Sequence, residues 1–165
     1  MSCLEDLELH RKNEVYLDAL GAQRIPDPTT AGDFCRRFDA YDVELLMRAI
    51  NSVRVKVWQQ QPKEFFERAI IDADGTLVTT LGECKQGMDI SYKGDWGYQV
   101  LTVTLANTGE VLFILNRRGS RPSQEGAAGY YDQAIGLCRR GGFVRVLLRG
   151  DTDFSQTVHL DRWDA

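Results

Sequence analysis

Aspartates follow two apolar segments that lie far apart in the sequence. Asp72 and Asp74 stand in the stretch IIDADGT, and Asp151 and Asp153 follow the apolar run FVRVLL. Carboxylates that lie close together repel each other unless they are protonated or bound to cations. Carboxylate oxygens suit Mg²⁺ or Mn²⁺, and two such ions about 4 Å apart can stabilise the attacking and leaving oxygens of a phosphodiester. Asp74 and Asp151 are therefore the candidate catalytic and metal-binding residues, Asp72 is a further candidate ligand, and Mg²⁺ (or Mn²⁺) is the expected cofactor.

The stretch IIDADGTLV also has a second interpretation. It resembles the first motif of haloacid dehalogenase-like phosphatases, an apolar strand followed by D-x-D-G-T. This resemblance implies a phosphohydrolase with Asp72 as nucleophile and Asp74 as acid/base. It also implies a mainly parallel sheet and a lysine on a later element, whereas no lysine follows Lys93. The phosphohydrolase is therefore the alternative hypothesis.

The elements that must position the aspartates can be predicted from the periodicity. The spacing of apolar residues predicts a helical N-terminal region over 1–66, with its clearest amphipathic helix in DAYDVELLMRAINSVRVKVW. From residue 67 the pattern predicts an α/β domain over 67–165. It contains a buried strand RAIIDA, with an irregularity at Gly75 before TLVTT, and a loop over 82–94. A hairpin follows in WGYQVLTVTLA and VLFILN, then a helix capped by Ser123 and ended by Gly141-Gly142, and a second buried strand FVRVLLRG.

The order of these elements predicts a topology. Three antiparallel strands, a right-handed crossover helix and a fourth strand parallel to the first form the start of a ribonuclease H-like fold. The carboxyl ends of the first and fourth strands then lie side by side, where α/β sheets place their ligands. Asp74 and Asp151, which are 77 residues apart (151 − 74), are expected to become neighbours there.

Composition limits the classes of protein. The chain has 165 residues, 43% apolar and 27% charged, which is typical of a globular protein. No apolar run approaches the roughly 20 residues of a membrane span, and the N-terminus is too acidic for a signal peptide, so we expect a cytoplasmic protein without a membrane partner. The four scattered cysteines predict reduced thiols and no zinc site.

The charge distribution bears on nucleic-acid binding. The net charge of −4 disfavours a nucleic-acid partner, but residues 111–150 carry seven arginines against Glu125 and Asp132. A basic face there would contact DNA phosphates without reading the bases. The candidate DNA-binding residues are Lys93, Arg117, Arg118, Arg121 and Arg149.

Six stretches in order resemble one enzyme family. They are DPTTAGDFCRRF, IIDADGT, YKGDWGYQVL, LANTGEVLF, NRRGSRPSQEGAAGYYD and VLLRGDTDFS, and they span about Pro26 to Trp163. They look like DDE transposases of bacterial insertion sequences, in the subgroup whose first motif reads D-x-D-x-T. The resemblance implies Asp74 as the first catalytic acid, Asp151 as the second and Asp72 as a supporting acid. It further implies cut-and-paste transposition, with transposon terminal repeats and target DNA as partners.

The sequence departs from the family at the third catalytic acid, a glutamate on a later helix. The acids near the end of the chain are Asp161 and Asp164, too close to Asp151, and Glu125 falls in the crossover region. We therefore expect a transposase fragment that is inactive alone, or a non-catalytic DNA-binding remnant. Without the later helix, part of the sheet would stay uncovered, which favours self-association as a homodimer.

Overall fold

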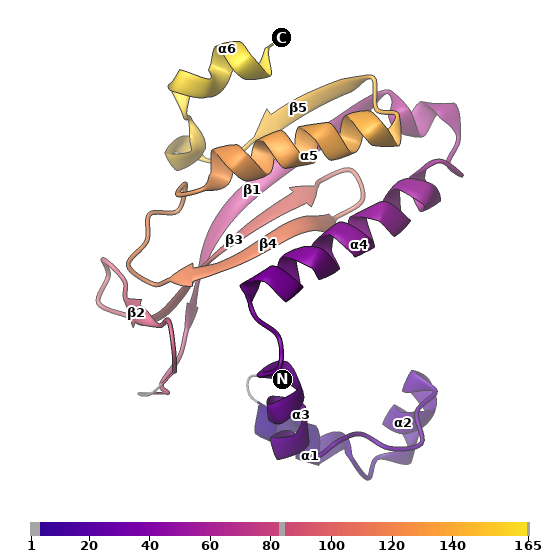
Figure 1. Ribbon diagram of the computed structural model, residues 1–165, viewed down its shortest axis with the longest axis vertical. Coiled ribbons are helices and arrows are strands. Elements are labelled where there is room, and N and C mark those ends of the chain that lie inside the picture. The colour runs from indigo at the N-terminus through magenta and orange to yellow at the C-terminus, as the bar shows by residue number, and fades with distance from the viewer. Residues whose placement is uncertain (1–3, 83–84, 165) are drawn as a thin grey trace. The chain divides into compact units, whose positions relative to one another are not determined.

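The computed structural model describes residues 4–82 and 85–164, and the chain divides into two compact units, one up to Arg48 and one from Ala49 on (Figure 1). The first unit is helical. It contains the 3-10 turn η1 (Leu4–Asp6), the helices α1 (Leu7–His10), α2 (Glu14–Leu20) and α3 (Pro28–Cys35), and the first half of α4 (Ala40–Trp58). The helical N-terminal region is thus present, although α1 and α2 are short and separate.

The second unit is built around one mixed sheet. Its strands are β1 (Arg68–Thr79), β2 (Asp89–Ile90), β3 (Trp96–Leu105), β4 (Glu110–Arg118) and β5 (Arg145–Arg149). Strand β3 pairs antiparallel with β1, β2 and β4, and β5 pairs parallel with β1. The crossover helix α5 (Ala127–Gly141) connects β4 to β5. The predicted order of three antiparallel strands, a helix and a parallel fourth strand is confirmed, and β2 adds a short strand where a loop was expected.

The remaining elements of this unit are short. They are η2 (Lys63–Phe66) before β1, and η3 (Thr152–Phe154), η4 (Thr157–His159) and α6 (Leu160–Trp163) after β5. None of the helices in the described part of the chain is long and apolar enough to cross a membrane. The sheet is mixed with a single parallel pair, so the mainly parallel sheet that the phosphohydrolase hypothesis predicts is not found in the described residues.

The core lies between the sheet and α5. Alternate residues of β1 are buried, including Ala69, Ile71 and Ala73, and they pack together with buried residues of β3 and α5. Burying a side chain such as Ile71 stabilises the fold by about 1.5–3 kcal/mol. Because side chains alternate across a strand, Asp72 and Asp74 lie on the opposite face, which is more exposed.

Two predicted boundaries differ from the structure. Strand β1 runs through Gly75 without an irregularity, because Gly75 pairs with Leu101 of β3. A Cβ at Gly75 would lie 2.9 Å from the Cβ of Ser123, so glycine is needed where the β4–α5 loop packs on the strand. Ser123 belongs to that loop, so the prediction that it caps the helix is wrong. Helix α5 begins at Ala127, with Gly126 at its N-cap. The predicted helix end is confirmed, since Gly142 closes α5 with a φ of 109°.

Candidate functional site

The register of β1 and β5 fixes the position of the first predicted acid, Asp72. Asp72 is the partner of Arg149 in this parallel pair, which is the last pair before β5 ends. Asp74 and Asp151 each follow two residues later on their own segment. Neighbouring strands lie about 4.8 Å apart. The topology therefore places Asp74 and Asp151 on adjacent segments, beyond the pair of Asp72 and Arg149.

Each of the three carboxylates has a partner inside the protein. Asp72 Oδ2 accepts a hydrogen bond from Arg149 Nη2 at 2.7 Å, and this ion pair raises the pKa of Arg149. Asp74 Oδ2 accepts from the hydroxyl of Thr76 at 2.8 Å. Asp151 Oδ1 accepts from the backbone N–H of Asp153 at 2.9 Å and so caps η3. Asp151 therefore has a structural role at the start of this turn in addition to its proposed one.

These carboxylates are suitable ligands for a divalent metal ion, but too few of them lie together to form a complete site. Their oxygens are the ligands that Mg²⁺ and Mn²⁺ prefer. Among the described residues, however, no group of three or more His, Cys, Asp or Glu side chains is arranged to hold a metal ion. Asp72 forms an ion pair with Arg149. Asp74 and Asp151 accept hydrogen bonds from uncharged groups, so they are the better candidates for metal ligands. Glu125 forms an ion pair with Arg121 at 3.2 Å in the β4–α5 loop.

Tyr131 on α5 reaches the end of β5, and this role could not be predicted from the sequence. Its side chain is 2% exposed, and its hydroxyl donates to the carbonyl oxygen of Arg149 at 2.9 Å. Burial raises the pKa of Tyr131 to about 12, and the charges of Asp72 and Asp151 act in the same direction. The phenol therefore lies close to both acidic segments. The YYD stretch shows an aromatic pair on a helix, but not which tyrosine points at the sheet.

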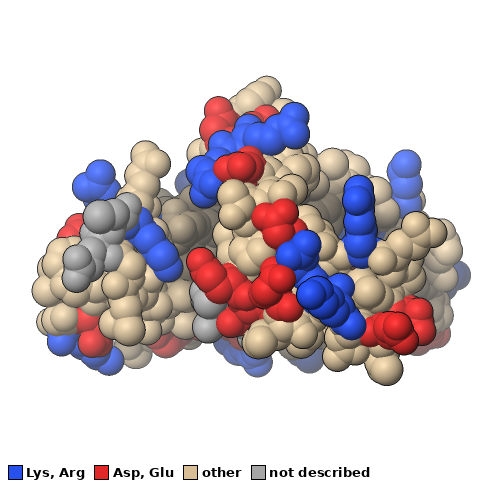
Figure 2. Space-filling view, turned by 90° about the horizontal axis from the view of Figure 1, so that it is seen from below, with Lys and Arg blue, Asp and Glu red and all other residues tan. Residues whose placement is uncertain are grey.

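The predicted DNA-binding cations have different environments. The half-buried Arg117 donates to the carbonyl oxygens of Gln99, Pro122, Ser123 and Glu125 at 2.5–3.1 Å and so holds the β4–α5 loop. Arg149 is bound to Asp72. Arg118 is exposed at the end of β4, and Lys93 and Arg121 line one pocket. Figure 2 shows acidic and basic side chains next to each other on the face that it draws. A DNA contact by any of these residues stays a prediction.

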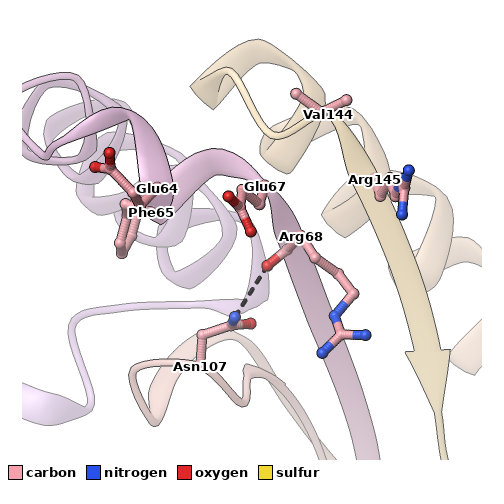
Figure 3. A pocket seen from close by; sticks show the side chains of 7 residues that line it. All are labelled: Glu64, Phe65, Glu67, Arg68, Asn107, Val144 and Arg145. Atoms are coloured by element: carbon pink, nitrogen blue, oxygen red, sulfur yellow. Dashed lines mark hydrogen bonds between the residues drawn. The ribbon is translucent and has the colours of Figure 1, made fainter.

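A separate pocket of about 610 Å³ lies at the other end of β1 and β5 (Figure 3). Its lining consists of Glu64, Phe65, Glu67, Arg68, Asn107, Val144 and Arg145. Asn107 serves the strand there, because its Nδ2 donates to the carbonyl of Arg68 and its Oδ1 accepts from the N–H of Ile70. This pocket is at the amino ends of the strands, away from the aspartates, and its polar groups support the start of β1.

Comparisons with known proteins add no relative. No family model matches the chain, and neither a curated protein nor a solved structure matches it. The resemblance to DDE transposases therefore stays a prediction from short motifs, and function is inferred from the residues and their geometry.

Proposed function

We propose that the chain is a fragment of a DNA transposase of the DDE type, with a partial ribonuclease H-like domain. The observation that carries this proposal is the parallel pairing of β1 and β5 with Asp72 opposite Arg149, because Asp74 and Asp151 each follow this pair by two residues in the sequence. The antiparallel β1–β3–β4 arrangement and the crossover helix α5 add support. The parent reaction would be hydrolysis of phosphodiesters at transposon ends, followed by strand transfer to target DNA.

Asp74 and Asp151 are the proposed catalytic acids and metal ligands, and Asp72 supports them. A bound Mg²⁺ or Mn²⁺ would stabilise the charge that develops on the phosphodiester oxygens. In this proposal Arg149 neutralises Asp72, Thr76 orients the carboxylate of Asp74, and Tyr131 holds the backbone from which Asp151 extends.

We further propose that the 165-residue chain binds DNA and a divalent cation weakly but does not cut DNA by itself. Among the described residues two carboxylates lack a cationic partner at this edge, one fewer than the family's triad supplies. A cation with fewer charged ligands is held less tightly. The phosphohydrolase alternative is disfavoured, because the carboxylate of Asp72 faces an arginine and the sheet is mixed.

The first test measures Mn²⁺ binding from the loss of the free-ion signal in electron paramagnetic resonance. Asp74→Asn and Asp151→Asn should each weaken binding, while Glu67→Gln, an exposed acid at the far end of β1, should not. Arg149→Gln should strengthen binding, because it removes a positive charge beside Asp72. Equal binding by the wild type and by both aspartate variants would refute the proposed site.

The second test is strand cleavage of terminal-repeat DNA with Mg²⁺ or Mn²⁺. The unmodified chain should not cut. Cleavage that is lost in Asp151→Asn would show that another residue, such as Glu125, supplies the third carboxylate. Turnover of an aryl phosphate that is lost in Asp72→Asn would favour the phosphohydrolase instead.

A further inference from the structure

A second polar pocket, of about 450 Å³, lies on the α5 side of the sheet before α5 begins. Its floor is formed by Gly75, Leu77 and Gln99, which belong to the face that α5 covers further along the strands. Its walls are two loops, 91–93 and 119–124, together with Asp153. Asp74 lies on the other face of the sheet, so this pocket is distinct from the proposed metal ligands although it lies next to them.

The first wall is a tight turn that presents an aromatic and a basic side chain. The N–H of Ser91 donates to the carbonyl of Asp95 at 2.8 Å, and the N–H of Gly94 donates to the carbonyl of Ser91 at 2.9 Å. The buried hydroxyl of Ser91 also accepts from two backbone N–H groups of the turn. Between these anchors Tyr92 is 92% exposed, and the Nζ of Lys93 lies 5.5 Å from the centre of its ring. Among the described residues no carboxylate pairs with Lys93.

The second wall is the loop 119–124, whose backbone is also held by hydrogen bonds. Arg117 donates to the carbonyl oxygens of Pro122, Ser123 and Glu125. The hydroxyl of Ser120 donates to Asp89 at 2.6 Å, and a Cβ at Gly119 would lie 2.4 Å from the carbonyl oxygen of Asp89. The backbone of the loop is therefore held close against β2. Arg121 lines the pocket and is half-exposed, and it forms an ion pair with Glu125 at 3.2 Å.

We propose that this pocket binds one nucleotide of a single-stranded DNA segment. The phosphate lies between Lys93 and Arg121, and the base stacks on the exposed ring of Tyr92. Cationic side chains beside an exposed aromatic ring are the features that single-strand binding requires. Pre-ordered loops lower the entropy cost of binding. The choice of DNA as the ligand rests on the proposed function, whereas the phosphate and base contacts follow from the pocket itself.

Asp153 sets a limit on where the phosphate can lie. Its exposed carboxylate is on the wall that leads to Asp151 and repels an anion there. The phosphate is therefore expected beside Lys93 and Arg121 and away from the carboxylate of Asp153. This charge pattern makes a further variant informative, because Asp153→Asn should strengthen binding of the same DNA.

The experiment measures binding of a short fluorescein-labelled oligothymidylate by fluorescence anisotropy across a salt series. Lys93→Gln and Arg121→Gln should each lower the affinity, and the double variant should reduce the salt slope of log K by about 0.7, the value for one phosphate contact on a single strand. Tyr92→Ala should lower affinity at least about fivefold without changing that slope. Lys63→Gln, an exposed lysine outside the pocket, is the matched control and should bind as the wild type does. Ultraviolet cross-linking of a bromouracil-substituted oligonucleotide should label Tyr92.

Equal losses in Lys63→Gln and Lys93→Gln would overturn the pocket, because they would show diffuse attraction to the whole protein. Unchanged affinity in Tyr92→Ala with no cross-link at Tyr92 would also overturn it. Asp74→Asn combined with Asp151→Asn separates the two proposals, since it should lose Mn²⁺ binding and keep oligonucleotide binding. Oligonucleotide binding at this pocket without Mn²⁺ binding by the wild type would support the pocket and refute the metal site. Mn²⁺ binding without oligonucleotide binding would support the metal site and refute the pocket.

Discussion

Replacing Tyr131 by phenylalanine should change the stability of the protein in opposite directions at neutral and alkaline pH. The hydroxyl of Tyr131 is buried against the end of β5 and donates to the carbonyl of Arg149 at 2.9 Å. Phenylalanine keeps the ring and its packing on Trp163 but removes this hydrogen bond. At pH 7 a hydrogen bond of this kind contributes about 1 kcal/mol to the free energy of unfolding.

The alkaline effect follows from the pKa of Tyr131, which burial raises from 10.0 to about 12. The native state keeps its proton to a higher pH than the unfolded state does, so the stabilisation is complete below pH 10 and is lost as the pH rises toward 12. The wild type has lost about 1 kcal/mol between pH 10.5 and 11 and about 2 kcal/mol by pH 12, whereas the phenylalanine variant has no hydroxyl to titrate. The two stability curves should therefore cross between about pH 10.5 and 11.

The assay is urea unfolding followed by tryptophan fluorescence under reducing conditions, at a series of pH values from 7 to 11. The wild type should be the more stable protein at pH 7 and the less stable one at pH 11. Tyr92→Phe removes an exposed hydroxyl and should match the wild type at pH 7. Curves for Tyr131→Phe and wild type that stay parallel throughout would refute the placement of this hydroxyl.

Three further predictions concern the framework around the site. Gly97→Ala should destabilise the protein by about 3 kcal/mol in urea unfolding, because the new Cβ would lie 2.3 Å from a carbonyl oxygen of β1. Gly129→Ala has open space around it in α5 and should stabilise the protein by about 0.5–1 kcal/mol. Equal effects of the two substitutions would contradict this prediction. Burial alone would raise the pKa of Glu110, but the hydrogen bonds to its carboxylate outweigh burial and lower it. Glu110→Gln should therefore destabilise the protein at pH 7. The difference in stability between this variant and the wild type should shrink as the pH falls below 4.5, which thermal unfolding can measure. Burial raises the pKa of the Cys138 thiol to about 12, so iodoacetamide should label the exposed Cys35 in the native protein but label Cys138 only after unfolding, as mass spectrometry of the peptides can decide.

The arrangement of strands was predictable because it depends on patterns that are local in the sequence. The alternation in WGYQVLTVTLA marks β3, and the turn NTGE leads into β4, with Gly109 at a φ of 73°. A helix between β4 and the next strand requires a crossover, and a crossover makes β5 parallel to β1. The predicted neighbourhood of strands β1 and β5 is confirmed, and it pairs Asp72 with Arg149, while the proximity of Asp74 and Asp151 stays a prediction.

Boundaries that depend on packing could not be predicted. Gly75 suggested an interruption of β1, because glycine often marks irregular strands. In the structure it is instead the small residue on which Ser123 packs, and the strand continues to Thr79. Ser123 suggested a helix cap, but Arg117 donates to its carbonyl oxygen within the loop, and α5 begins at Ala127.

The sequence by itself determined that this protein has a helical N-terminal region and a mixed sheet with one parallel pair, β1 with β5. Strand β1 does not end at its aspartates, as the sequence suggested, but continues to Thr79. Only the tertiary structure decided which groups the aspartates meet: Arg149 for Asp72 and the cap of η3 for Asp151, with Tyr131 bound to the backbone at the end of β5. The physical reason is that hydrophobic periodicity repeats over a few residues and can be read locally. A hydrogen bond between residues 77 positions apart depends instead on strand register, in which a shift by one residue turns every side chain to the other face.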